Sequence, residues 1–175
     1  MPTIETCIYH APCADLVLGT LDGRLCLCDW TASQRGGRTR RRVERLLNAT
    51  LRPGTNALLE ATAAQLDEYF VRRRSAFSLP LLPAGTDFQR AVWQALCRIP
   101  YGTTLTYAQL AAAIGRPTAV RAVANAIGAN ALSIIVPCHR VVGSNGSLTG
   151  FAGGLNVKRY LINLETTSIN LQIET

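Results

Sequence analysis

The stretch Thr106–Ile127, TYAQLAAAIGRPTAVRAVANAI, contains two short helical patterns separated by a Gly-Arg-Pro-Thr break. A Thr-x-x-Gln capping box that begins at Thr106 predicts a helix over Tyr107–Ile114. Gly115 fits the C-terminal stop of that helix, and Pro117 fits the first turn of the next one. Two short helices joined in this way are typical of a helix-turn-helix, while an ordinary αα-hairpin in a protein core is the alternative.

A cysteine and a histidine lie side by side downstream of these helices. Ser133–Val136 is apolar and β-branched, which predicts a buried strand, and the segment Pro137–Val141, PCHRV, follows it directly. Five glycines within Gly143–Gly154 predict a loop that lets the backbone approach a ligand closely. A last helix is predicted over Asn156–Glu165 and is followed by a tail over residues 167–175.

The residues upstream predict a third helix, a linker and a separate lobe. A second Thr-x-x-Gln capping box at Thr86 begins a helix that ends near Pro100. Two prolines in Ser75–Gly85 indicate an extended linker. Before it we expect strands over Thr3–His10, Asp15–Thr20 and Arg24–Trp30, a hairpin turn at Leu21–Gly23, and helices over Arg38–Ala49 and Asn56–Arg73.

These patterns predict an α+β fold. A small N-terminal antiparallel-sheet lobe with helices occupies residues 1–80, and a linker ends at residues 81–85. A mostly helical C-terminal domain with the helix-turn-helix occupies residues 86–166, and a tail occupies residues 167–175. The chain has 175 residues and is 48% hydrophobic, which is enough apolar material for globular domains.

The composition indicates the cellular compartment of the protein and the kind of partner that it binds. No apolar run approaches the roughly 20 residues of a membrane span, and Met1–His10 lacks a basic region followed by an apolar one. We therefore expect a cytoplasmic protein that is neither secreted nor membrane-spanning, with six free thiols. Lys plus Arg exceed Asp plus Glu by 18 to 11, almost entirely through arginine. This excess suggests a polyanionic partner, although a base composition that favours arginine codons explains it equally well.

Cys138 is the candidate nucleophile. The alternative is a structural role, in which Cys138 is a small buried apolar side chain. Successive side chains of an extended segment point to opposite faces, so Cys138 and His139 need a local turn or a bridging water to pair. Glu165 lies beside the apolar stripe of the last helix, where a carboxylate needs a cationic or donor partner. A Cys–His–Glu relay is one interpretation. A solvated Glu165 is the other.

Two further clusters have mainly structural interpretations. The first lobe contains five potential zinc ligands, Cys7, His10, Cys13, Cys26 and Cys28. Their spacing is not that of a paired zinc knuckle, so we predict no metal and keep a zinc site as the lesser alternative. The arginine-rich run over Arg38–Arg45 is read as a solvated helix face, with phosphate binding as the lesser alternative.

The segment Ile135–Val141, IVPCHRV, resembles the active-site signature of the O6-alkylguanine-DNA alkyltransferases. The resemblance covers essentially all of residues 86–165, whereas the residues before them match only in general layout. The other matching positions are Thr86–Gln89, Val92-Trp93, Ile99–Gly102, Tyr107, Leu110-Ala111, Gly115–Pro117, Val120–Val123, Asn130, Gly153-Gly154 and Lys158.

The resemblance implies single-turnover repair of double-stranded DNA that contains O6-alkylguanine and, in addition, O4-alkylthymine. Cys138 would accept the alkyl group, His139 would act as a base through a water, and Glu165 would orient the histidine. Tyr107 would rotate the target nucleotide and donate toward the guanine, and Arg121 would fill the vacated stack from the minor groove. Asn130 would brace the turn near the site.

The remaining implied positions fall into two groups. Further DNA contacts are expected from the turn and the second helix, at Thr118, Ala122, Arg116 and Ala129. The substrate pocket is expected at Val141, Gly150, Phe151, Ala152 and Gly153. Ala152 stands where some members have serine, so a backbone amide is expected to supply that contact. The zinc ligands of human-type members do not align with this chain.

The resemblance implies no cofactor and no membrane partner. It implies a cytoplasmic monomer that is nucleoid-associated if bacterial, with cooperative binding along DNA left open. Two other functions compete with this interpretation. A silent lesion-binding relative has tryptophan at the acceptor position, where this chain has Cys138. A cysteine hydrolase would need a histidine distant in sequence, and His10 is the only other one.

Overall fold

A computed structural model describes residues 1–33, 35 and 37–173, with side chains described through Thr167. The chain forms two compact units, one of Met1–Gly85 with Ala131–Ile135, the other of Thr86–Asn130 with the chain from Val136 onward. The elements mix helices and strands, which confirms the predicted α+β class. Within the described part of the chain, no helix is long and apolar enough to cross a membrane.

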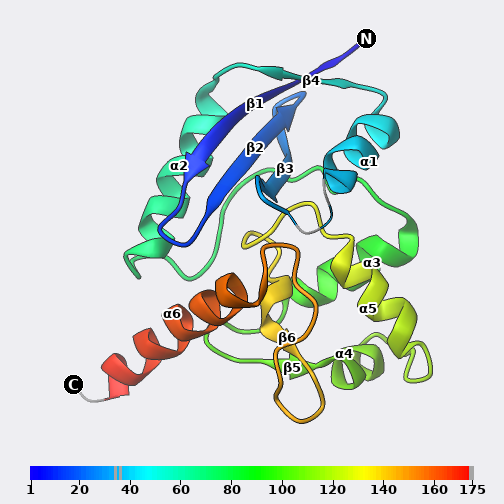
Figure 1. Cartoon of the computed structure of the whole chain (residues 1–175), viewed down its shortest axis with the longest axis vertical. Coiled ribbons are helices and arrows are strands. Elements are labelled where there is room, and N and C mark those ends of the chain that lie inside the picture. Colours follow the sequence, from blue (N-terminus) through cyan, green and yellow to red (C-terminus); the bar gives the residue numbers. More distant parts are fainter. Residues whose placement is uncertain (34, 36, 174–175) are drawn as a thin grey trace. The chain divides into compact units, whose positions relative to one another are not determined.

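The first unit contains a four-stranded sheet in the order β3-β2-β1-β4 (Figure 1). Three strands follow the predicted hairpin pattern, and Asp22 and Gly23 both have positive φ in the turn between the last two, which is typical of a two-residue hairpin loop. Their bounds are β1 Thr3–His10, β2 Asp15–Leu21 and β3 Arg24–Trp30.

The predicted antiparallel sheet also contains one parallel pair. β4 (Thr50–Pro53) pairs with β1 in parallel, with Ile4 opposite Leu51. The reason is the helix α1 (Arg38–Leu47), which carries the chain back across the sheet before β4 begins. Such a crossover brings a strand in with the same direction as its neighbour.

The helix α2 (Ala57–Phe70) is capped by Asn56, whose side-chain oxygen accepts a hydrogen bond from the Leu59 backbone N–H. This cap satisfies one of the helix's first, otherwise unpaired donors. Its predicted apolar face buries Leu59, Leu66 and Phe70. None of the six cysteines, all of which lie in the described part of the chain, forms a disulfide.

The second unit contains the predicted helices in order. Both capping boxes are present, at Thr86 and at Thr106, because each threonine accepts from the third residue of its helix while the glutamine there accepts from the threonine N–H. The elements are α3 Asp87–Cys97, β5 Leu105–Thr106, α4 Tyr107–Ala113, α5 Val120–Gly128, the 3-10 turn η1 Cys138–Arg140, β6 Val141–Val142 and α6 Leu155–Ile173. β5 and β6 pair in parallel.

Two helix limits differ from the prediction. Pro117 does not lie in the first turn of a helix, because α5 begins only at Val120 and residues 116–119 form a turn. The last helix does not end at Glu165 but continues to Ile173, through residues assigned to a tail. No proline or glycine interrupts Thr166–Ile173, so nothing local stops the helix. The final part of the predicted tail, residues 174–175, lies outside the described residues.

The buried strand predicted over Ser133–Val136 is absent. Within this stretch the Ser133 N–H donates to the Cys28 carbonyl at 2.9 Å, and Leu132, just before it, forms an isolated bridge with Cys28. Ile134 has a φ of 71°, a left-handed conformation that no regular strand contains. The apolar composition therefore reflects burial and not a strand.

Candidate active site

The turn η1 places Cys138, His139 and Arg140 in one 3-10 turn instead of the extended segment predicted from the sequence. Pro137 precedes the turn with a φ of −80°, and the Arg140 N–H donates to the Pro137 carbonyl at 3.1 Å. Successive side chains in a 3-10 turn diverge by about 120°. The cysteine and the histidine are both buried, with 7% and 0% of their surface exposed.

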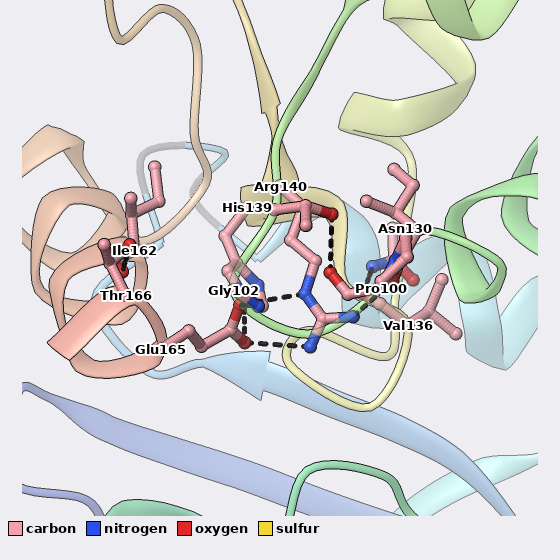
Figure 2. Close-up of polar contacts among 11 residues, drawn as sticks. Pro100, Gly102, Asn130, Val136, His139, Arg140, Ile162, Glu165 and Thr166 are labelled. Carbon is pink, nitrogen blue, oxygen red and sulfur yellow. Dashed lines mark hydrogen bonds and ion pairs between the residues drawn. The ribbon is translucent and has the colours of Figure 1, made fainter. Parts of the chain in front are cut away.

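Glu165 lies on α6, which packs against η1, and its carboxylate is held by both residues that follow Cys138 (Figure 2). His139 Nε2 and Glu165 Oε1 are 2.8 Å apart. Arg140 donates to both carboxylate oxygens, each at 2.9 Å. Glu165 is 1% exposed, so the sequence prediction of a desolvated carboxylate with His139 as its partner is confirmed.

The protonation states of this cluster follow from burial and donors. Burial alone raises the pKa of Glu165, but the hydrogen bonds and charges of His139 and Arg140 outweigh it and lower that pKa to about 2. Burial lowers the pKa of His139, against the opposing effect of Glu165. The glutamate is therefore ionised and the histidine neutral near pH 7. Since a carboxylate only accepts, Nε2 carries the histidine proton.

The second ring nitrogen of the histidine remains available. His139 Nδ1 is buried and has no hydrogen-bond partner among the described residues. With Nε2 protonated, Nδ1 bears a lone pair and can accept a proton. The arrangement thus offers a neutral imidazole base, oriented from behind by an ionised carboxylate, next to a buried thiol.

Arg140 is the part of the cluster that sequence reasoning missed. Its guanidinium also donates to the Ile99 carbonyl at 2.7 Å and lies 5.7 Å from the centroid of the Tyr101 ring. It thereby ties Glu165 to the turn after α3. The available signal was the need of a buried carboxylate for a cation, which the arginine beside His139 meets better than the histidine alone.

Asn130 and Tyr107 are also engaged near the turn. The Asn130 side chain donates to the Val136 carbonyl at 2.9 Å, just before Pro137. The Tyr107 hydroxyl donates to the Thr149 carbonyl in the glycine-rich loop at 3.2 Å. Asn130 thus braces the entry to η1, and Tyr107 contacts the loop that was predicted to form the pocket wall.

The helix α5 separates a buried face from an exposed one. Its apolar residues Val123, Ala126 and Ile127 are buried, and Trp93 Nε1 donates to the Ala126 carbonyl at 2.8 Å. Arg121 and Ala122 are exposed on the other face. No acidic residue occurs on this helix. Its solvent face is thus suited to a polyanion.

The other predicted contact residues have varied exposure. Thr118 and Arg116 are exposed, and the Arg116 guanidinium lies 5.8 Å from the centroid of the Phe88 ring, whereas Ala129 is buried. Of the predicted pocket residues, Val141 and Phe151 are buried, Ala152 and Gly153 half-buried, and Gly150 exposed. Their roles remain predictions. The described residues contain no group of three or more His, Cys, Asp or Glu side chains placed to hold a metal ion.

The second unit thus combines a helix pair, whose second helix exposes Arg121, with a buried thiol that precedes a neutral imidazole, which is a set of features suited to a nucleic-acid-binding protein with a reactive cysteine. Residues 87–167 match the family described as "6-O-methylguanine DNA methyltransferase, DNA binding domain". The chain is 52% identical over 107 residues to the methylated-DNA–protein-cysteine methyltransferase of Methanosarcina barkeri, covering 61% of this chain and 68% of that one. It is 56% identical over 105 residues to the constitutive enzyme of that name from Bacillus subtilis, covering 59% and 64%.

Solved structures agree along nearly the full length. The Mycobacterium tuberculosis O6-methylguanine methyltransferase superposes with a TM-score of 0.81 at 36% identity, over 98% of this chain and 99% of that one. A second structure, of M. tuberculosis OGT in complex with DNA, gives 0.79 at 37% identity, over 95% and 94%. The chain belongs to the family of methylated-DNA–protein-cysteine methyltransferases.

Proposed function

We propose that this chain is a single-turnover DNA repair protein that transfers a methyl or other alkyl group from O6 of guanine in double-stranded DNA to Cys138, and also accepts alkyl groups from O4 of thymine. The observation that supports this most is the buried Cys138 beside His139, whose Nδ1 has no partner among the described residues while Glu165 holds Nε2. Membership of the family and the DNA-bound relative support the same function.

The residues account for each step of the transfer. His139 Nδ1 takes the proton of the Cys138 thiol through a bridging water, because the 3-10 turn directs the two side chains apart. The thiolate sulfur attacks the alkyl carbon, the S–C bond forms as the C–O6 bond breaks, and the electron pair remains on the guanine. Tyr107 donates toward the base as this charge develops. The product thioether has no ionisable proton, so the protein reacts once.

The helix pair accounts for access to the lesion. O6 is engaged in pairing inside the duplex, so the nucleotide must rotate out at a cost of a few kcal/mol, which is smaller for a damaged pair. The exposed Arg121 on α5 fills the vacated space and offsets part of that cost. The minor groove suits a protein that must find a lesion in any sequence, because its pattern is degenerate. The exposed residues Arg116, Thr118 and Ala122 complete the contact, and Ala129, which is buried, follows directly after α5.

The charge of residues 86–165 also supports DNA binding. Between residues 86 and 165 the chain has seven basic residues and two acidic ones, Asp87 and Glu165, of which Glu165 is buried in the site. The half that contains the acceptor is thus strongly positive, as phosphate contacts require. We place the protein in the cytoplasm, in contact with the chromosome, as a monomer.

The loop 143–154 supplies the substrate pocket in this proposal. Gly150 has a φ of 43°, and Ala152 offers no side-chain hydroxyl, so its backbone amide is the donor to the departing oxygen. Val141, Phe151 and Gly153 form the remaining wall, and the alkyl groups accepted are those that fit beside them.

The mass of the intact protein tests the proposal. Incubation with duplex DNA that carries O6-methylguanine should raise the mass by one methyl group, with no transfer beyond one equivalent and with the modification on Cys138. Turnover beyond one equivalent, as a cysteine hydrolase would give, or modification of another cysteine would contradict it.

The assigned role of Arg121 has its own test. The variant Arg121→Ala should weaken duplex binding and repair but leave the reaction with free O6-benzylguanine nearly unchanged, because the free base needs no extrusion. Arg159→Ala is a matched control on α6, and it should change neither assay. Equal losses of Arg121→Ala in both assays would rule out the role.

A further inference from the structure

Lys158 is a buried cation to which the proposed mechanism gives no task. It lies in the first turns of α6 and is 0% exposed. No carboxylate of the described residues forms an ion pair with it. Removing an ammonium from water without a counter-charge costs several kcal/mol, so such a lysine needs an anionic partner or strong polar contacts.

The contacts of Lys158 connect two parts of the site. Its ammonium donates to the Thr149 carbonyl at 3.0 Å and lies 5.9 Å from the centroid of the Tyr107 ring. The Tyr107 hydroxyl donates to the same carbonyl. One backbone carbonyl of the glycine-rich loop thus accepts from both side chains, which holds the loop 143–154 to α4 and α6.

Helix geometry directs Lys158 toward the turn η1. It precedes Glu165 by seven residues, so the two side chains lie on one face of α6, about two turns and roughly 10 Å apart. Glu165 contacts η1 directly, so Lys158 shares the face of α6 that packs on η1. Burial lowers the pKa of Lys158, while the negative charge of an ionised Cys138 raises it, and the charge of Lys158 in turn lowers the pKa of His139. The ammonium therefore acts electrostatically on both reacting groups.

We propose that Lys158 is a positioning residue for alkyl transfer: its ammonium is the counter-charge of the Cys138 thiolate, and through the Thr149 carbonyl it holds the loop 143–154 beside that thiol. The inference rests on the proposed function, because a thiolate is needed only if Cys138 is the acceptor. It explains how a buried lysine without a carboxylate is tolerated. It also gives the thiolate a counter-charge once His139 has taken the thiol proton.

The test follows Cys138 reactivity without DNA or alkylguanine, so its failure is distinguishable from failure of the proposed function. Rates of Cys138 modification by iodoacetamide, mapped by peptide mass, are measured from pH 5 to 9 for the wild type, Lys158→Met and Lys158→Arg. The charged and titratable groups around the turn are His139 and Arg140 on η1, Lys158 and Glu165 on α6, Tyr107 on α4 and Cys97 on α3.

In Lys158→Met the midpoint of the pH profile should rise by at least about one pH unit, and the rate at pH 7 should fall about tenfold. Lys158→Arg keeps the charge and should restore most of the rate. Arg159→Met removes the same charge from the adjacent, exposed position and should leave the profile unchanged. Hydrogen exchange of residues 143–154 should accelerate in Lys158→Met. An unshifted midpoint, or an equal shift in Arg159→Met, would overturn the proposal.

A second measurement keeps the native lysine in place, in case Lys158→Met does not fold. The stability of the wild type is compared with that of Cys138→Ser, whose hydroxyl does not ionise in this range. If the thiol ionises more readily in the folded chain than in the unfolded one, the wild type gains stability over Cys138→Ser as the pH rises toward about 8.5. A pH-independent difference would contradict the pairing.

Discussion

Two buried carboxylates in this chain, one in each unit, are both paired with an arginine and yet behave in opposite ways. Asp29 in β3 has a side chain that is 1% exposed and one contact with Arg40 at 3.4 Å. Glu165 in α6 has a side chain that is 2% exposed, two contacts with Arg140 at 2.9 Å and one with His139 at 2.8 Å. Burial raises the pKa of Asp29, whereas the donors lower that of Glu165 to about 2.

A nearby arginine does not by itself hold down the pKa of a buried carboxylate. The Arg40 side chain is 23% exposed and reaches Asp29 with one nitrogen, so water screens it and burial dominates. Arg140 is 8% exposed and presents two nitrogens to both oxygens of Glu165. A bidentate arginine contact in a buried site therefore outweighs the effect of desolvation on the pKa of the carboxylate. The unit that contains the acceptor cysteine is the one that has this arrangement.

Removal of the Glu165 charge should have the largest effect. Glu165→Gln leaves Arg140 buried without its counter-charge and His139 with a neutral acceptor in place of an anionic one, so the unfolding free energy should fall by about 3–5 kcal/mol. The rate of methyl transfer should fall by about 10²–10⁴-fold. Urea denaturation and single-turnover kinetics measure the two effects. Glu68→Gln, which breaks the exposed pair with Arg74, is the control and should cost less than about 1 kcal/mol. A similar loss of unfolding free energy in Glu165→Gln and Glu68→Gln would contradict the special contribution of the buried carboxylate.

Loss of the bidentate contact between Arg140 and Glu165, with the positive charge retained, should have an intermediate effect on stability. Arg140→Lys keeps the positive charge but reaches Glu165 with one point donor and abandons the Ile99 carbonyl. The expected cost is about 1–3 kcal/mol of stability, together with a rise in the Glu165 pKa that carbon-13 NMR of the carboxyl would report. An unchanged Glu165 pKa would show that charge alone suffices, as it does not for Asp29.

The two carboxylates should give opposite pH dependences of stability. Glu165 has a lowered pKa, so its contribution is fully present above its ordinary value near 4.5 and is lost as the pH falls from there toward 2. His139 also has a lowered pKa, so its contribution is present above its ordinary 6.5 and is lost as the pH falls below it. In Glu165→Gln the acid limb below pH 4.5 should flatten. A limb as steep as that of the wild type would exclude Glu165 as its source.

Neutralisation of Asp29 should have the smallest effect. A raised pKa means that the stability this group contributes is present below its ordinary 3.8 and is lost as the pH rises through the folded-state value. Asp29→Asn mimics the protonated form, so at pH 7 it should be neutral or stabilising, within about 1 kcal/mol. Any excess in the unfolding free energy of Asp29→Asn over that of the wild type should disappear toward pH 3. A loss comparable to that of Glu165→Gln would erase the contrast between the two sites.

The sequence predicted the elements that depend on local patterns. The capping boxes at Thr86 and Thr106, the first three strands and the position of Glu165 beside a buried stripe all follow from spacing along one element. The parallel pairing of β4, the left-handed Ile134 and the turn at Cys138–Arg140 depend on where distant segments meet. Spacing along the chain does not carry that information.

Arg140 illustrates the same limit within the site. Arg140 stands within the IVPCHRV signature, but the groups it contacts, the Ile99 carbonyl and the Glu165 carboxylate, lie far away in sequence. From the sequence, the need of a buried Glu165 for a cationic or donor partner led to the prediction of His139 as that partner. Only the geometry shows that the arginine supplies most of the contacts and leaves the histidine free to act as a base.

The protonation state of His139 tests this account most directly. Nitrogen-15 NMR of the two histidines at pH 7 distinguishes them readily, because His139 is fully buried and His10 has a side chain that is 79% exposed. We expect a neutral His139 ring with the proton on Nε2 and an unprotonated Nδ1. A doubly protonated ring, or a proton on Nδ1, would contradict the assignment of His139 as the base that activates Cys138.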